Sequence, residues 1–147
     1  MSSVYSALID HKKRFGGTIA WRLKAHAKVI EKHLNPGEEI LYAFSCQKGY
    51  SSFEIFNTFA VVLTNKRLLV AQKRLFFGYI FLAITPEMFN DVTVKTGIIW
   101  AKLHIDTIKE EVVLSNLSKK GITEIETKIT DYMMEEKKKY AHIASQL

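Results

Sequence analysis

The stretch FAVVLTNKRLLVAQKR, residues 59–74, decides the fold, because it places two apolar runs on either side of the polar residues 64–67. Both runs have the length of a strand and consist mainly of residues that favour β-structure. Asn65 tolerates the positive φ that a tight hairpin loop requires. The stretch therefore predicts a β-hairpin with Asn65 and Lys66 at its tip.

Downstream of Pro36, apolar residues recur at every second position in short segments, which glycine, asparagine or charged residues separate. This period is typical of β-strands with one buried face. Seven such segments in succession predict an antiparallel sheet that folds on itself. The expected strands are residues 38–46, 53–64, 67–74, 79–85, 89–97, 98–107 and 110–116.

The last segment of the chain returns to a helical period, with Ile122, Ile125, Ile129 and Met133 on one side and Gly121 at its entry. A helix in this place covers an open corner of a small barrel and buries apolar surface that the sheet cannot bury alone. The expected fold is mainly β (α+β by content): a bent, seven-stranded antiparallel barrel that a C-terminal helix caps.

The beginning of the chain predicts a basic helical arm, residues 1–35, ahead of a domain formed by residues 36–147. One helix is expected over residues 3–14, with Ser3 as its cap. After a glycine pair, a second helix is expected over residues 19–34. The composition, with 48% hydrophobic and 24% charged residues, suits one domain with a core and an appendage.

The arm carries most of the positive charge of the chain. Residues 1–36 hold seven Lys and Arg against two Asp and Glu, a net charge of +5, whereas residues 37–147 hold fourteen against thirteen. A concentrated positive field attracts polyanions. The cations of the second expected helix lie mostly off its apolar stripe. The stripe is Ile19, Leu23, Ala27, Ile30 and Leu34, and the cations are Arg22, Lys24, Lys28 and Lys32.

The apolar stripe of this arm needs a cover, which its own barrel, a second copy of the protein or an anionic membrane could provide. A narrow stripe suits a protein groove better than a lipid surface, and only Trp21 resembles an interfacial anchor. We therefore expect the arm to dock on protein and the chain to form a homodimer or a larger assembly.

A second predicted turn, residues 73–79, places Lys73 and Arg74 before two aromatic residues, Phe76 and Phe77. Cations beside inserting aromatics are typical of peripheral membrane proteins. The alternative is that both phenylalanines point inward at the end of a strand, and this is the favoured interpretation because aromatic side chains are more often buried.

The run LTNKRLLV, residues 63–70, resembles the "TNkRli" hairpin of bacterial pleckstrin-homology (PH) domains, in particular those of the YokE-like kind. Further segments follow in the order of that family and extend the similarity over about residues 34–132. They are LNPGEEI (34–40), PEMFNDVTVKTG (86–97), KLHIDT (102–107) and VVLSNLSKKGITEI (112–125). The resemblance implies a PH-like barrel that serves as a binding or assembly module, in a family whose members mostly lack an assigned ligand.

Arg67 is expected to have a structural role, since it would stand opposite Thr64 and hold the hairpin in register by hydrogen bonds. Eukaryotic lipid-binding PH domains place several cations in the loop between their first two strands. The corresponding residues 47–54 offer only Lys48 beside Glu54. A specific inositol-phosphate site is therefore not expected.

No arrangement typical of catalysis or of a metal site is found in the sequence. The only cysteine, Cys46, is expected to be a small strand residue. His104 and Asp106 are expected on the solvated face of one strand. His26 and His33 are about 10 Å apart along a helix, too far to bind one metal. We therefore expect neither enzymatic activity nor a cofactor.

The sequence thus predicts a non-enzymatic PH-like module for protein–protein interaction or self-association; the alternative is a peripheral module that binds anionic lipid through the arm and the 73–79 turn. Nucleic acid is not an expected partner, because cations gather at turns and on a helix instead of alternating with aromatics on a sheet face. The first residues lack the order of a secretory signal, so a cytoplasmic protein is expected, with the inner face of the membrane as the alternative place. Candidate contacts to an anionic surface are Arg22, Lys24, Lys28, Lys32, Lys66, Lys73 and Arg74; candidate apolar contacts are Trp21, Phe76 and Phe77; the structural hairpin residues are Thr64, Asn65, Lys66 and Arg67.

Overall fold

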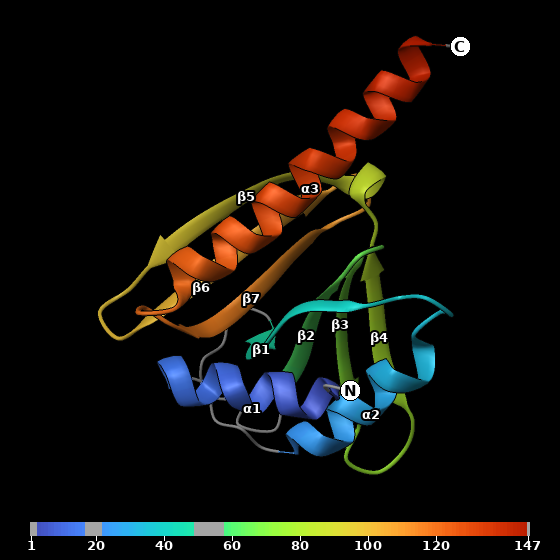
Figure 1. The fold of residues 1–147 in the computed structure, drawn as a ribbon. Helices are drawn as coiled ribbons and strands as arrows, with labels where there is room; N and C mark the ends of the chain where they lie inside the picture. Colours follow the sequence, from blue (N-terminus) through green and yellow to red (C-terminus); the bar gives the residue numbers. More distant parts are fainter. Residues whose placement is uncertain (1–2, 17–21, 49–57, 147) are drawn as a thin grey trace.

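The computed structural model describes residues 3–16, 22–48 and 58–146 of the chain. In these residues seven strands form one antiparallel sheet in the order β4-β3-β2-β1-β7-β6-β5, and three α-helices pack against it (Figure 1). The strands are β1 (Ile40–Lys48), β2 (Thr58–Thr64), β3 (Leu68–Lys73), β4 (Tyr79–Ile84), β5 (Phe89–Thr96), β6 (Trp100–Thr107) and β7 (Glu111–Ser118). The helices are α1 (Val4–Phe15), α2 (Leu23–His33) and α3 (Ile122–Ser145), and a short 3-10 helix, η1 (Pro86–Met88), links β4 to β5.

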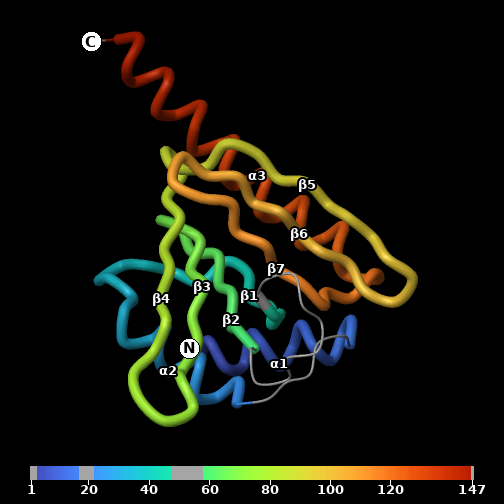
Figure 2. The backbone as a smooth tube through the Cα atoms, turned by 180° about the vertical axis from the view of Figure 1, so that it is seen from behind, coloured from blue at the N-terminus to red at the C-terminus, as the bar shows by residue number. Residues whose placement is uncertain are grey.

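The sheet is curled into a half-barrel of two parts, β1–β4 and β5–β7, whose strands run at a steep angle to each other (Figure 2). The two parts are joined by a short pairing of β1 with β7, in which Gln47 is opposite Ser115 and Lys48 is opposite Leu114. Each predicted strand is confirmed within a few residues, although residues 53–57 of the second one lie outside the described residues.

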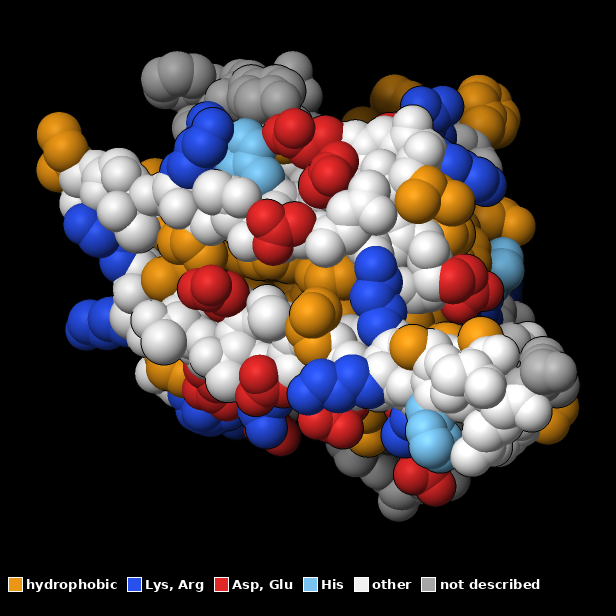
Figure 3. Space-filling model, turned by 90° about the horizontal axis from the view of Figure 1, so that it is seen from above, with side chains coloured by type: hydrophobic (Ala, Val, Ile, Leu, Met, Phe, Trp, Pro, Cys, Tyr) orange, Lys and Arg blue, Asp and Glu red, His pale blue; other side chains and the backbone are white. Residues whose placement is uncertain are grey.

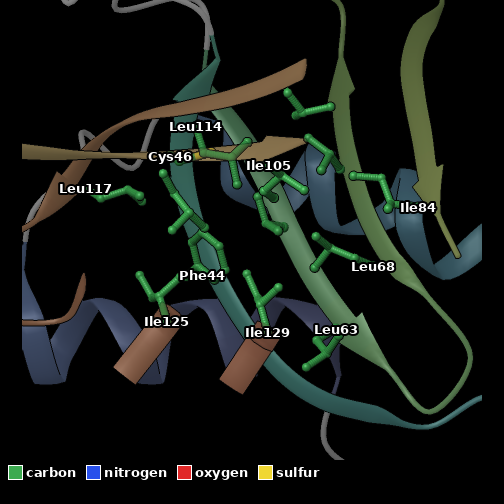
Figure 4. Packing of buried hydrophobic residues seen from close by; sticks show 14 of the residues in the cluster. Phe44, Cys46, Leu63, Leu68, Ile84, Ile105, Leu114, Leu117, Ile125 and Ile129 are labelled. Carbon is green, nitrogen blue, oxygen red and sulfur yellow. The ribbon is translucent and has the colours of Figure 1, made fainter. Parts of the chain in front are cut away.

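The concave side of the sheet and α3 share the main hydrophobic core. Phe44, Ile105 and Leu114 of the strands lie together with Ile125 and Ile129 of α3 (Figure 4), and each of these side chains is at most 1% exposed. Burial of a side chain of this size stabilises the fold by about 1.5–3 kcal/mol. The predicted C-terminal cap is therefore confirmed, and its buried residues are the four that the helical period indicated.

The convex side of β1–β3 is covered by α1 and α2, which form a second hydrophobic cluster with it (Figure 1). Under the helices the strands present small side chains, Ala43, Ala60 and Ala71, which allow the helices to approach closely. Because it has a core on both sides, β2 is buried at every position. This explains its continuous apolar run, since alternation is expected only where one face meets water.

The helical arm is confirmed, with a shorter second helix than expected. The Ser3 side chain accepts a hydrogen bond from the backbone N–H of Ser6 and caps α1. Arg22, directly before the second helix, has a φ of 57°, in the left-handed region. A right-handed helix cannot extend through a residue in this conformation, so α2 begins at Leu23. Ile19 lies outside the described residues, while the stripe residues Leu23, Ala27 and Ile30 face the sheet of the same chain. The division at residue 35 stays a prediction.

Candidate functional site

The predicted hairpin tip is confirmed: Asn65 and Lys66 form a tight turn between β2 and β3. The backbone N–H of Thr64 donates to the Arg67 carbonyl at 2.9 Å. The Thr64 hydroxyl oxygen in turn accepts the N–H groups of Lys66 and Arg67, each at 3.1 Å. Thr64 thus satisfies the backbone of the turn from within, as hydroxyl residues often do.

Arg67 has a structural role, as expected, but its side chain binds the loop before β1 instead of the opposite strand. Its Nε lies 3.1 Å from Oε2 of Glu38, and its Nη2 lies 3.2 Å from Oε1 of the same carboxylate and 2.8 Å from the His33 carbonyl. Thr64 donates its hydroxyl proton to Glu38 at 2.6 Å. Nε and Nη2 of the guanidinium are therefore engaged within the protein, and Glu38 compensates its charge.

Glu38, which the sequence reasoning did not single out, is the centre of this arrangement. Its side chain is 0% exposed. Burial alone would raise the pKa of Glu38, but hydrogen bonds from Arg67, the Asn35 N–H and Thr64 outweigh burial and lower it below the ordinary value. The carboxylate is consequently ionised at neutral pH and joins the hairpin to the end of α2.

The loop between β3 and β4, residues 74–78, exposes its aromatic residues to solvent. Phe76 is 82% exposed and Phe77 is 87% exposed, and Leu75 before them is half exposed. The expectation that both phenylalanines point inward is therefore wrong. β3 ends at Lys73 and β4 begins at Tyr79. Within the described residues, no further strand covers the loop between them. Two large apolar side chains thus stand at the tip of a hairpin.

α2 holds the base of this loop in place. The backbone N–H of Lys73 donates to Nδ1 of the buried His26 at 2.8 Å, and Nη1 of Arg22 donates to the Lys73 carbonyl at 3.0 Å. Both backbone groups of one residue are thereby tied to the helix. His26, which appeared in the sequence only as a scattered histidine, proves to be a positioning residue.

The packing of α2 on β3 gathers most of the predicted cations on one side of the molecule. Arg22, Lys73 and Arg74 meet at the base of the loop, while Lys24, Lys28 and Lys32 are exposed along α2. The carboxylate of α2, Glu31, accepts a hydrogen bond from the Val4 N–H and so lies toward α1. Trp21 lies outside the described residues.

Lys66 does not join this group. It is exposed at the β2–β3 turn, at the opposite end of β3 from the β3–β4 loop. A six-residue strand spans about 20 Å, which is more than twice the screening length of about 8 Å in physiological salt. The candidate contacts therefore separate into one cluster and one distant lysine.

The opposite side of the molecule has a different character. Seen from above, the face that carries α3 and β5 shows acidic and basic side chains intermixed, with hydrophobic side chains between them (Figure 3). Charges of alternating sign cancel within a short distance and attract neither polyanions nor polycations strongly. The face seen in Figure 3 thus differs in character from the side that carries α2.

A second exposed apolar tip was missed by the sequence reasoning. Ile98 is 96% exposed and Ile99 is 68% exposed at the turn between β5 and β6. The signal was the apolar run directly after Gly97, which was assigned to a strand. In Figure 1 this turn lies at the far end of β5, away from the β3–β4 loop.

The residues considered for catalysis lie in different surroundings. His104 was expected on a solvated face, but it is buried with its Nδ1 2.6 Å from Glu111, while Asp106 is exposed. Cys46 is fully buried. Among the described residues, no three His, Cys, Asp or Glu side chains come together as a metal site. None of the helices in that part of the chain has the length and apolar character of a membrane span.

Comparisons with known proteins agree with the PH-like barrel. Residues 34–131 match the family model described as bacterial PH domain. The chain is similar to the crystal structure of a DUF1696 family protein with a pleckstrin-homology domain from Shewanella loihica PV-4, with a TM-score of 0.52, 18% identity and coverage of 76% of this chain and 93% of that one. It is also similar to a pleckstrin homology domain from Shewanella amazonensis SB2B, with a TM-score of 0.52, 17% identity and coverage of 85% and 98%. No curated protein matches the chain.

The match confirms the resemblance predicted over residues 34–132, and the narrower likeness to the YokE-like kind stays a prediction. At these identities the solved structures support the fold alone. The matched region begins after α2, so the cations and the contacts that α2 contributes lie outside it.

Proposed function

Because the chain belongs to the bacterial PH domain family, generally non-catalytic binding modules, we propose that it docks on anionic membrane surfaces through its β3–β4 loop. The observation that carries this proposal is the exposure of Phe76 and Phe77, 82% and 87%, at the tip of a loop with cations at its base. The lipid alternative from the sequence thereby becomes the leading function.

The energetics of the loop support membrane docking. Insertion of two phenylalanine side chains into the acyl boundary contributes about 1.5–3 kcal/mol each. Each cation near an anionic surface adds about 1 kcal/mol. Neither contribution alone gives stable recruitment, since a peripheral protein needs two signals. The loop and α2 supply one apolar and one electrostatic signal on the same side of the molecule.

The attachment of the loop to α2 also favours docking. Lys73 is bonded through its N–H to His26 and through its carbonyl to Arg22. A loop whose base is fixed loses less conformational entropy when its tip becomes ordered in a membrane. The helical arm, whose apolar stripe was expected to be covered by its own barrel or by a second copy, has this additional role in the proposal.

Flotation with vesicles tests the proposal. The intact protein is expected to float with anionic vesicles, more weakly as salt rises, and to stay unbound with neutral vesicles. Phe76→Ser/Phe77→Ser should reduce binding at least about 100-fold, because two insertions are lost. The matched control is Tyr140→Ser/Ile143→Ser, which removes two exposed apolar side chains from the projecting end of α3.

The control variant should bind as the unmodified protein does. Membrane docking through the loop is refuted if the phenylalanine variant keeps its binding, or if both variants lose it equally. Strong binding to neutral vesicles would show that charge has no part.

Self-association, the leading expectation from the sequence, remains a second candidate. It is favoured by the end of α3, which projects beyond the barrel with Tyr140 and Ile143 more than half exposed (Figure 1). The arm no longer supports it, since its stripe is covered by the sheet of the same chain. Light scattering on the intact chain and on the α3 variant would measure it.

A further inference from the structure

We propose that a hollow between α2 and the start of β4 binds a phosphate monoester, and that on a membrane this group is the headgroup of a lipid such as phosphatidic acid. The inference rests on the proposed membrane docking and extends it by assigning a ligand to a site that α2, which precedes the matched region, forms together with Lys73 and Tyr79 inside that region. The same chemistry is offered by free phosphate monoesters, so the experiment separates the two sources.

The hollow has a volume of about 170 Å³ and is lined by Lys28, Val29, Lys32, His33, Lys73 and Tyr79, with Ala25 at its edge. Three of these residues carry an ammonium group, and none carries a carboxylate. The size suits one phosphate group with the first atoms of its ester, not an acyl chain.

One wall of the hollow is rigid. His33 donates from Nδ1 to the Val29 carbonyl at 2.7 Å, and its ring is stacked on Phe81 with the centroids 4.2 Å apart. The Tyr79 hydroxyl lies 3.2 Å from Nε2 of His33, and the Tyr79 ring meets the His33 ring edge-on. Because Nδ1 donates, Nε2 accepts the proton of Tyr79. The tyrosine is therefore fixed at the rim before any ligand arrives.

The three lysines concentrate positive charge around the hollow. Lys28 and Lys32 are four residues apart on α2, so their side chains are neighbours on one face, where like charges repel. Lys73 comes from β3 and is held against α2 by its backbone. A dianion that enters between them relieves this repulsion, and a monoester carries more charge than the diester of an ordinary phospholipid. Three lysines around one hollow thus favour the monoester.

The location of the hollow suits a headgroup. Lys73 and Tyr79 are paired across β3 and β4, and the chain between them is the docking loop. When Phe76 and Phe77 insert below the headgroups, the two residues at the base of the loop remain at the level of the phosphates. One docking event would therefore seat the phenylalanines in the membrane and a phosphate in the hollow.

The test compares vesicles that contain phosphatidic acid with vesicles that contain phosphatidylglycerol at equal surface potential. Lys28→Gln/Lys32→Gln removes two charges from the hollow. The matched control, Lys24→Gln/Arg74→Gln, removes two charges from exposed residues of the same face that do not line it. Binding of inorganic phosphate and of glycerol 3-phosphate to each protein is measured by calorimetry without vesicles.

The intact protein should prefer phosphatidic acid by about tenfold, since the monoester brings one more negative charge close to the lysines. Lys28→Gln/Lys32→Gln should abolish this preference, whereas the control should bind both vesicles more weakly and keep the ratio. Equal preference in the intact protein, or an unchanged ratio in the hollow variant, overturns the inference while leaving membrane docking intact.

Two further outcomes separate the inference from the proposed function. The intact protein could fail to bind vesicles but bind glycerol 3-phosphate, while Lys28→Gln/Lys32→Gln binds neither. In that case the hollow is a phosphate site and its ligand is a soluble ester. If the intact protein binds neither vesicles nor soluble esters, phosphate binding in the hollow and membrane docking are both refuted.

Discussion

Glu38 and Arg67 lie at the point where the hairpin meets the end of α2, and they explain why the hairpin motif contains Thr, Asn and Arg. Asn65 adds a third connection: its side-chain oxygen accepts the Glu39 N–H at 2.9 Å, and its own N–H donates to the Glu39 carbonyl at 3.0 Å. The motif thus connects the β2–β3 turn to the loop before β1. In this protein it is a structural joint.

Removal of Arg67 alone should be strongly destabilising. Arg67→Met leaves the fully buried Glu38 carboxylate without its counter-charge, which costs about 3–5 kcal/mol of unfolding free energy. Arg67→Met/Glu38→Gln should be less destabilising than Arg67→Met, because no charge is then buried alone. Urea denaturation measures both, and Lys66→Ala at the exposed neighbouring position serves as control. A loss below about 1 kcal/mol in Arg67→Met would contradict this account.

His11 makes the stability depend on pH. It is 8% exposed, its Nε2 lies 2.7 Å from the Tyr42 hydroxyl, and burial lowers the pKa of His11 to about 4. The unfolded chain takes up this proton near pH 6.5, before the folded protein does. The contribution of neutral His11 to the free energy of unfolding is therefore fully present above about pH 6.5. It is lost as pH falls toward 4, which lowers the free energy of unfolding by up to about 3 kcal/mol.

Urea midpoints between pH 4 and 7.5 measure this dependence. His11→Gln keeps a hydrogen-bonding partner for Tyr42 and cannot titrate, so its midpoint should fall much less over the same range. His142→Gln, at an exposed position near the end of α3, is the control and should follow the unmodified protein. Identical slopes for His11→Gln and the unmodified protein would show that other groups cause the effect.

At the scale of elements, the arm and the C-terminal helix meet. The Phe15 carbonyl at the end of α1 accepts a hydrogen bond from the Ser118 hydroxyl at 3.0 Å, and Arg14 forms an ion pair with Glu124 at 2.5 Å. Gly121, at the entry of α3, packs closely against Phe15 of α1. A Cβ at this position would stand 2.9 Å from Cγ of Phe15. The glycine at the entry of α3 is thus required by packing, not by backbone conformation, since its φ is −97°.

Gly121→Ala should destabilise the protein by about 1–3 kcal/mol, because the contact involves the root of the Phe15 ring and cannot be relieved by a rotation of its tip. Gly121→Ala/Phe15→Ala should show a smaller combined loss than the sum of the two single changes. Thermal or urea unfolding of the three variants measures this coupling. Additive losses would mean that α1 and α3 do not meet at this glycine.

For the whole molecule, the sheet of β1–β3 has a hydrophobic cluster on each side, one with α3 and one with α1 and α2. The arm is therefore part of the stable structure although the family match begins at residue 34. Val4, Leu8, Leu23 and Ile30 are at most 3% exposed. Together they contribute about 6–12 kcal/mol, which is comparable to the entire stability of a domain.

Deletion of residues 1–33 should abolish stable folding or cause aggregation, because it uncovers Ala60, Val62 and Leu69 on the convex side of the sheet. Gel filtration, dye binding and urea unfolding measure the result. Deletion of residues 141–147 removes only the exposed end of α3 and the last residue, and should leave the midpoint unchanged. A monomeric, stable chain without the arm would show that the second cluster is dispensable.

The sequence by itself determined the elements, since strands and helices follow from local period and turn chemistry. The hairpin at Asn65, the seven strands, the capping stripe of α3 and the Ser3 cap each depend on residues within one element, and each was predicted. The cations and aromatics of the 73–79 turn were also identified from their neighbours. Lys66 and Lys73 were also expected at opposite ends of one strand, and the structure places them there.

Only the tertiary structure decided what each element faces. Burial depends on partners that are far apart in the chain, as with Glu38 and Arg67, or Lys73 and His26. For the same reason the sequence could not tell that Phe76 and Phe77 are exposed, or that the arm covers its own sheet. The hollow beside Tyr79 exists because α2 packs on β3 and β4, and no local pattern specifies that contact.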